Sequence, residues 1–207
     1  MLHYQAIDST TLELLKKLLR LAGFEQLRLA GGTSLALQYG HRKSIDLDLF
    51  GEFTMDTIML SSYLGSIGEV KILQNLQHIK SYLINGIKVD IVNYPYPWIG
   101  PLLSIDQVRL ASDRDIGAMK LAAITGRGAK KDFFDLYFLL KRFTLRELLS
   151  FYNQKYMDGS AFMVIKSLVY FEDAEADVDP VQLIPASWSD VKSSIVHHQK
   201  EYLDNLT

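Results

Sequence analysis

Cysteine is absent from the 207 residues of this chain. Its absence excludes disulfide bonds and thiolate metal sites, and it fits a reducing cytoplasm. Neither sign of charge dominates, because the chain has 22 lysines and arginines and 24 aspartates and glutamates, which give a formal net charge of −2. The surface as a whole is therefore not suited to attract nucleic acid, and RNA binding would need a local basic patch.

Long hydrophobic runs, repeats and low-complexity segments are also missing. No stretch of about 18 apolar residues predicts a membrane-spanning helix. The first residues, MLHYQAIDSTTLELL, lack the basic and apolar regions of a secretory signal. We therefore expect a soluble cytoplasmic protein with no membrane partner. Its hydrophobic content of 48% supports a real core.

Periodicity and turn residues predict a mixed α/β protein. The expected strands are 27–30, 45–50, 77–84 and 87–94, the last two flanking the hairpin signal Asn85-Gly86. The expected helices are 8–21, 33–39, 56–65, 112–124, 130–143, one capped by Thr144 and Glu147, 160–170 and 189–203. The proline-rich stretch 94–101 predicts a boundary between an α/β core (1–100) and a mainly helical region (101–207) that packs on it and completes the active site.

Two aspartates on one strand are the first candidate site. Because residues i and i+2 of a strand share a face, Asp46 and Asp48 should project together while Ile45, Leu47 and Leu49 face the core. Two adjacent carboxylates raise each other's pKa unless a cation lies between them. Mg²⁺ or Mn²⁺, held by carboxylates and substrate phosphates, would supply that cation.

Asp90 is a third candidate ligand, because it interrupts the apolar strand sequence Val-Asp-Ile. Three carboxylates from two strands could hold two metal ions about 3.5–4 Å apart, the arrangement for in-line phosphoryl or nucleotidyl transfer. Asp90 is also a candidate general base for an acceptor hydroxyl.

Gly31 and Gly32 follow a short strand and open a helix. Glycines there let backbone N–H groups approach a phosphate, and the helix N-terminus favours its negative charge. With Thr33 or Ser34 they could hold the triphosphate of a nucleotide. Taken singly, a Gly-Gly pair is more often a turn, and an Asp-Leu-Asp strand is more often a half-exposed edge. Their order and spacing are more specific than any one of them.

The order Gly-Gly, thirteen residues, Asp-Leu-Asp-Leu and a later Val-Asp-Ile resembles the DNA polymerase beta-like nucleotidyltransferases. More closely, GGTSLAL with HRKSIDLDLF, then Asp115-x4-Lys120 and AAITGRGAKKDFFDLYFLL, is similar to the AbiEii/AbiGii toxins of type IV toxin–antitoxin systems. The resemblance implies the polymerase beta-like fold followed by a helical bundle. It also implies a toxin that transfers a nucleotide from an NTP to a cellular acceptor such as tRNA, restrained by a cognate antitoxin.

The resemblance favours a role for Lys120 in stabilising the charge that builds during transfer; from the sequence alone, that lysine could equally extend from the edge of the core. Arg127, in a glycine-flanked break, could bind phosphate through its planar guanidinium. In the family reading, Asp132 and Asp135 would lie at the edge of the active site and bind Lys120, Arg127 or the acceptor. Asp135 ranks higher and is the catalytic candidate, whereas Asp132 is a candidate for nucleotide binding. The remaining candidates for nucleotide binding are Lys131, Arg42 and Ser44.

Two alternatives stay open. The protein could modify a small-molecule hydroxyl, such as that of an antibiotic, which the slightly acidic balance favours over RNA. It could also be an inactive nucleotide-binding or partner-binding module, although such a module needs no set of three acids. A basic patch would favour RNA; the residues expected to form it are Arg42, Lys43, Arg127, Lys130 and Lys131.

Overall fold

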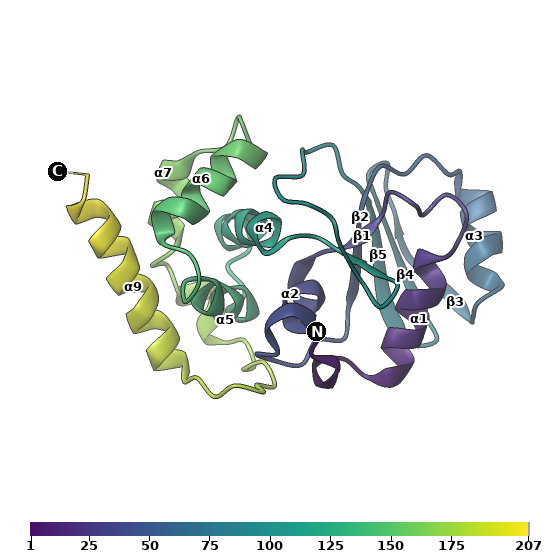
Figure 1. Ribbon diagram of the computed structural model, residues 1–207, viewed down its shortest axis with the longest axis horizontal. Helices are drawn as coiled ribbons and strands as arrows, with labels where there is room; N and C mark the ends of the chain where they lie inside the picture. Colours follow the sequence, from purple (N-terminus) through teal and green to yellow (C-terminus); the bar gives the residue numbers. More distant parts are fainter. Residues whose placement is uncertain (207) are drawn as a thin grey trace.

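The computed structural model describes residues 1–206 and contains one mixed sheet with helices on both sides (Figure 1). The strands are β1 Arg28–Leu29, β2 Leu47–Gly51, β3 Val70–Asn75, β4 Ile79–Ile84, β5 Ile87–Asn93, β6 Leu103–Ile105 and β7 Val108–Leu110. The helices are α1 Ser9–Leu19, α2 Gly31–Tyr39, α3 Thr57–Gly65, α4 Asp113–Gly126, α5 Lys130–Leu139, α6 Leu145–Lys155, α7 Ala161–Ser167, α8 Glu172–Glu175 and α9 Trp188–Asp204, with a 3-10 turn at Tyr4–Ala6.

The sheet has the strand order β3-β4-β5-β2-β1-β7-β6. The pairs β2–β5 and β1–β7 are parallel, and the other neighbours are antiparallel. The predicted α/β class is therefore correct. Among residues 1–206, none of the helices combines the length and apolar character needed to cross a membrane.

Two hydrophobic cores lie on opposite faces of the sheet. Leu47 and Leu49 of β2 point into a core shared with α1 and α3. Phe50 instead packs against the second core, which α2, α4, α5, α6, α7 and α9 build. Figure 1 shows this division, with α1 and α3 on one side of the sheet and the helical half on the other. Asp48, on the same face of β2 as Phe50, therefore faces the helices, which is the geometry a site between the two halves requires.

The structure corrects several predicted boundaries. β2 begins at Leu47, so Asp46 lies in the preceding loop, and Ile45 is 63% exposed rather than directed to the core. β3 was not predicted because its exposed face shows no alternation. β6 and β7 also escaped prediction, because they are short and their turn uses Asp106 and Gln107 at positive φ without a glycine. Both strands follow the predicted boundary at residue 100, yet they belong to the sheet.

Other predictions on the helices are confirmed or adjusted by a few residues. Thr144 and Glu147 form the predicted capping box of α6. α4 continues to Gly126, two residues beyond the predicted end, whereas α5 stops at Leu139, four residues early. The short helix α8 was not predicted.

A buried ion pair fastens the proline-rich segment to the helices. Lys155 of α6 lies 2.9 Å from the Asp115 carboxylate of α4 and donates a 2.6 Å hydrogen bond to the Pro97 carbonyl. Asp115 also accepts hydrogen bonds from the backbone N–H groups of Ile99 and Gly100 at 2.9 and 3.0 Å. Burial opposes its charge, yet these donors and the Ser112 hydroxyl hold the pKa of Asp115 below its usual value. One carboxylate therefore joins the segment 97–100 to two helices.

Replacing Asp115 by alanine should lower the free energy of unfolding by about 3–5 kcal/mol, because the buried Lys155 ammonium loses its counter-charge. Urea unfolding measures this change. The control is Asp158→Ala, at an exposed position, with an expected effect within about 0.5 kcal/mol. Equal stability of the two variants would contradict the assigned role of Asp115.

Candidate active site

Asp48 and Asp90 are neighbours across the parallel strands β2 and β5. Lys88 lies on the same face of β5 as Asp90, and its Nζ donates a 2.6 Å hydrogen bond to Oδ2 of Asp90. The other oxygen of Asp90, Oδ1, is buried without a hydrogen-bond partner. Sequence reasoning missed Lys88, although its position two residues before Asp90 on the same face was the available signal.

Burial raises the pKa of Asp48, and the neighbouring Asp90 carboxylate raises it further, against the opposing charge of Lys120. A buried carboxylate next to a second carboxylate with an unpartnered oxygen fits a divalent cation. Within residues 1–206, however, no three acidic or histidine side chains already converge as a metal-binding cluster. Asp46, the third predicted ligand, lies in the loop before β2, 3.8 Å from the Lys131 ammonium.

The two glycines of α2 let its first turn approach charged side chains. Gly31 has a φ of +62°, and a Cβ there would lie 2.4 Å from Oδ2 of Asp48. A Cβ on Gly32 would lie 2.1 Å from Nη2 of Arg42. Neither position can carry a side chain unless these groups move. The helix N-terminus, with its partial positive charge, thus lies directly beside Asp48.

The predicted hydroxyl groups of Thr33 and Ser34 are buried, that of Ser44 is partly buried, and all three form hydrogen bonds within the protein. Thr33 Oγ1 lies 2.8 Å from Ser44 Oγ and also donates a hydrogen bond to the Asp46 carbonyl. Ser34 Oγ accepts a 3.1 Å hydrogen bond from Gln38 Nε2. Thr33 and Ser44 therefore fix the loop that carries Asp46, which makes them positioning groups in this structure.

Asp135 of α5 is fully buried and gathers three basic side chains. Arg42 donates to both of its oxygens at 2.6 and 2.9 Å, and His41 Nε2 lies 2.7 Å away. Lys120 of α4 lies 2.5 Å from the same carboxylate. Burial opposes the charge of Asp135, but Arg42 and Lys120 hold its pKa well below its usual range.

Asp132, one turn earlier, continues this network. It accepts a 2.8 Å hydrogen bond from Lys120 and two from Arg127, at 2.8 and 3.0 Å. Burial raises its pKa less than the charges of Lys120 and Arg127 lower it. The two aspartates thus bind Lys120 and Arg127, which was one of the alternatives predicted for them. Arg127 keeps a side chain that is 59% exposed.

The five predicted basic residues do not form a continuous open patch. Arg42 is buried against Asp135, and Lys130 is buried near Asp179, 3.1 Å away. Exposed side chains remain on three of the five: Lys43, Arg127 and Lys131.

A cavity of about 300 Å³ lies between the sheet and α4. Four of the residues that line it are polar or belong to the first turn of α2, and all four were predicted site residues: Gly31, Asp48, Lys120 and Arg127. The other four are apolar or lack a side chain, and none was predicted: Phe50, Met119, Ala123 and Gly126. We call this the active-site cavity. Phe50 could have been found from its position on the same face of β2 as Asp48.

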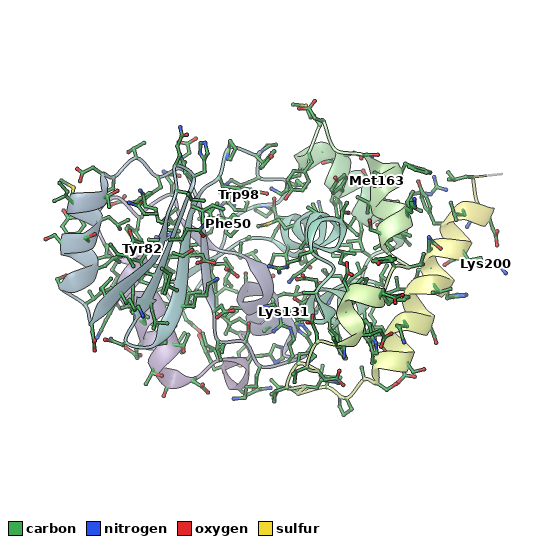
Figure 2. The ribbon with its side chains drawn as sticks, turned by 180° about the vertical axis from the view of Figure 1, so that it is seen from behind. Phe50, Tyr82, Trp98, Lys131, Met163 and Lys200 are labelled. Carbon is green, nitrogen blue, oxygen red and sulfur yellow. The ribbon has the colours of Figure 1, made fainter. Side chains whose placement is uncertain are left out.

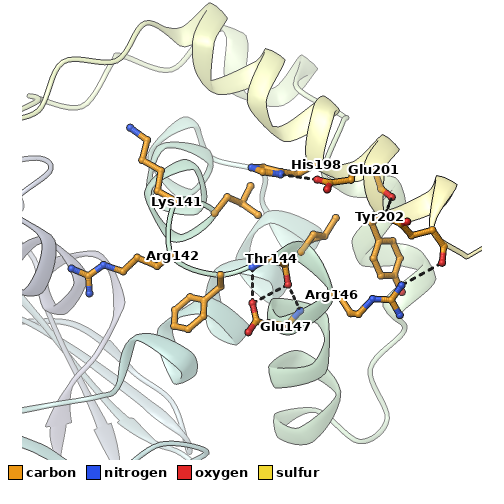
Figure 3. Close-up of a pocket in the computed structure, with 12 residues that line it drawn as sticks. Lys141, Arg142, Thr144, Arg146, Glu147, His198, Glu201 and Tyr202 are labelled. Atoms are coloured by element: carbon orange, nitrogen blue, oxygen red, sulfur yellow. Dashed lines mark hydrogen bonds and ion pairs between the residues drawn. The ribbon is translucent and has the colours of Figure 1, made fainter.

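A larger cavity of about 480 Å³ lies between α9 and the turn that joins α5 to α6 (Figure 3). Several of its charged groups already have partners within the protein: Glu147 accepts a hydrogen bond from the Thr144 backbone N–H in the cap of α6, and His198 lies 3.6 Å from Glu201. Arg146 lies over the Tyr202 ring. No predicted site residue lines this cavity, and we do not assign the reaction to it.

Comparisons with known proteins identify the family of this chain. Residues 13–205 match the family model described as "Nucleotidyl transferase AbiEii toxin, Type IV TA system". An uncharacterized protein of Aquifex aeolicus (strain VF5) is 37% identical over 199 residues, which are 93% of this chain and 96% of that protein.

Two crystal structures of Helicobacter pylori proteins share the fold. One, described as a candidate nucleotidyltransferase, superposes with a TM-score of 0.57 at 18% identity, over 97% of this chain and 99% of the other. The second, JHP933, has a TM-score of 0.53 at 17% identity, over 96% of each chain. Together with the match along nearly the whole sequence, this agreement places the chain in a family: it belongs to the AbiEii nucleotidyltransferase toxins of type IV toxin–antitoxin systems.

Proposed function

We propose that this protein transfers a nucleotide from an NTP to a hydroxyl group of a cellular RNA such as tRNA, with Mg²⁺ or Mn²⁺. The observation that carries the proposal is the pairing of Asp48 with Asp90 across two parallel strands, beside the N-terminus of α2. The family of this chain supports nucleotidyl transfer and the existence of a cognate antitoxin. We propose that the antitoxin is encoded by a gene nearby. We propose the cytoplasm as the place of action of this chain, consistent with the absence of cysteine.

Asp46, Asp48 and Asp90 are the residues that would hold the metal. Two observations support this assignment: the unpartnered oxygen of Asp90 and the raised pKa of Asp48. A bound cation would give that oxygen a partner and would lower the pKa of Asp48 by offsetting the repulsion from Asp90. When bound, the metal would neutralise the triphosphate and the charge that develops during transfer.

The transfer itself forms one bond and breaks another. The acceptor oxygen bonds to the α-phosphorus of the NTP as the bond from this phosphorus to the bridging oxygen breaks, and pyrophosphate leaves with that electron pair. We assign the proton of the acceptor hydroxyl to Asp90, whose Oδ1 has no hydrogen-bond donor. The N-terminus of α2, at Gly31 and Gly32, would face the triphosphate, with Thr33 and Ser34 on the same turn.

Lys120 and Arg127 would stabilise the negative charge on the phosphates, because both line the active-site cavity. Arg127 is exposed and can reach a phosphate directly. Asp132 and Asp135 would then be positioning residues, since their carboxylates are occupied by basic groups. Arg42 and Ser44 act in the same indirect way, and the exposed Lys131 would face the substrate near Asp46.

The family and the surface of the protein favour different acceptors. An RNA acceptor rests on the family, whereas the partial exposure of the predicted basic residues favours a small-molecule hydroxyl as the second candidate. The assay below separates the two.

The first prediction concerns Asp48. Asp48→Asn should reduce label transfer from α-labelled NTP to RNA by at least about 100-fold, because the amide cannot hold a cation in the same way. The reaction contains Mg²⁺, each of the four NTPs in turn, and total cellular RNA or none. Its fold should be kept, since the amide removes a buried charge whose pKa is already raised.

The matched control is Glu52→Gln, the same chemical change at an exposed residue close along the chain, which should leave transfer unchanged. Full activity of Asp48→Asn would contradict the proposed site. Intact NTP binding by the wild type without label on RNA, for any NTP, would contradict the RNA acceptor and favour a small molecule.

The second prediction concerns metal binding and needs no activity. Mg²⁺ should raise the Tm of the wild type, with a stabilisation of about 2.7 kcal/mol at a concentration of 100 Kd. Asp90→Asn should lose most of this response because it removes one of the two paired carboxylates. Differential scanning calorimetry with Mg²⁺ or EDTA measures the shift. Equal shifts in both proteins would show that the cation binds elsewhere.

A further inference from the structure

Half of the residues that line the active-site cavity are apolar or lack a side chain. We call these four its apolar end: Phe50, Met119, Ala123 and Gly126. The other four we call its charged end: Gly31, Asp48, Lys120 and Arg127. Met119 and Ala123 are one turn apart on α4 and flank Lys120 in sequence. The cavity thus pairs a charged end with an apolar end, as a ligand with a charged tail and a flat apolar body requires.

Phe50 lies close to Asp48 on β2. It follows Asp48 by two residues on the same face of β2, which places it about 6–7 Å further along the strand. Its side chain is only partly buried, and it faces the helical half of the molecule. Figure 2 shows Phe50 and Trp98 where the sheet meets the helices.

The ring of Phe50 packs against a cluster of other aromatic side chains. Tyr94 meets it edge to face, with the ring centroids 5.0 Å apart and the planes at 80°. Tyr94 in turn contacts Trp98 at 5.5 Å and shares a 2.8 Å hydrogen bond with the Tyr156 hydroxyl. A ring fixed in this way loses little freedom when a second flat group stacks on its open side.

Gly126 keeps the apolar end open. It lines the cavity at the last turn of α4, and a Cβ built on it would meet no atom within 4 Å. A Cβ at this position therefore meets open space, and a larger side chain there would take up part of that space.

We infer that this apolar end is the nucleobase subsite, in which the base of the NTP stacks on Phe50 against the wall of Met119 and Ala123. The inference rests on the proposed function, because it assumes a triphosphate at the charged end. Stacking on an aromatic ring suits any base, so the ring provides affinity and the four NTPs can be compared directly.

Two variants test the subsite by binding, without turnover. Gly126→Leu should fill the apolar end and weaken NTP binding at least about tenfold, and Phe50→Leu should weaken it by about 5- to 150-fold through loss of stacking. Phe50→Tyr, which keeps the ring, should restore binding to near the wild-type Kd. The Kd values of the four NTPs and of inorganic tripolyphosphate are measured in Mg²⁺ by calorimetry.

The matched control is Gly65→Leu on α3, another helical glycine whose Cβ would meet no atom within 4 Å, away from this cavity. Thermal unfolding checks that each variant is folded. Tripolyphosphate, which has no base, should bind all the variants alike.

Equal losses for NTP and tripolyphosphate, or no loss for NTP, would overturn the subsite while leaving the proposed function in place. Failure of the wild type to bind any NTP would overturn the proposed function as well. Weaker NTP binding with unchanged tripolyphosphate binding would support both.

Discussion

The buried carboxylate of Asp135 is the interaction on which the site depends. It binds Arg42 from the loop after α2 and Lys120 from α4, so one side chain of α5 fixes two other elements. Arg42 then packs over Gly32, which ties the first turn of α2 to the same group. Removal of Asp135 would leave the buried guanidinium of Arg42 without a carboxylate partner, and a loss of this kind costs about 3–5 kcal/mol.

Two pairs of aspartates lie in this region with opposite electrostatic states. Asp132 and Asp135 are surrounded by basic groups, and their pKa values are held low. Asp48 adjoins Asp90, and its pKa is raised. The first pair has its counter-charges within the protein and is suited to hold structure. The second lacks a full counter-charge, which is the condition under which carboxylates bind a cation.

Much of this arrangement could be predicted from the sequence, because the signals are local. The alternation around Asp48, the Gly31-Gly32 pair before a helix and the Thr144–Glu147 capping box are all patterns within a few residues. Ile45 was placed on the wrong face because β2 starts two residues later, and a strand boundary depends on its partner strands.

The contacts of the charged residues could not be predicted, because they join positions far apart in the chain. Nothing in the sequence around Arg42 indicates that it meets Asp135, 93 residues away, rather than solvent. The apolar end of the cavity escaped prediction for a related reason. Phe50 and Met119 have the residue types of an ordinary core, and only the fold shows that a space remains between them.

The parallel pairing of β1 with β7 has a consequence for synthesis of the protein on the ribosome. Leu29 pairs with Leu110, so β1 cannot pair with β7 until about 80 more residues have been synthesised. At about 5–20 residues per second, this interval lasts roughly 4 to 16 s. Lys120, Asp132 and Asp135 emerge later still, and Asp135 is the carboxylate that pairs with Arg42. A nascent chain therefore carries the acidic strand well before it carries the residues that complete the site.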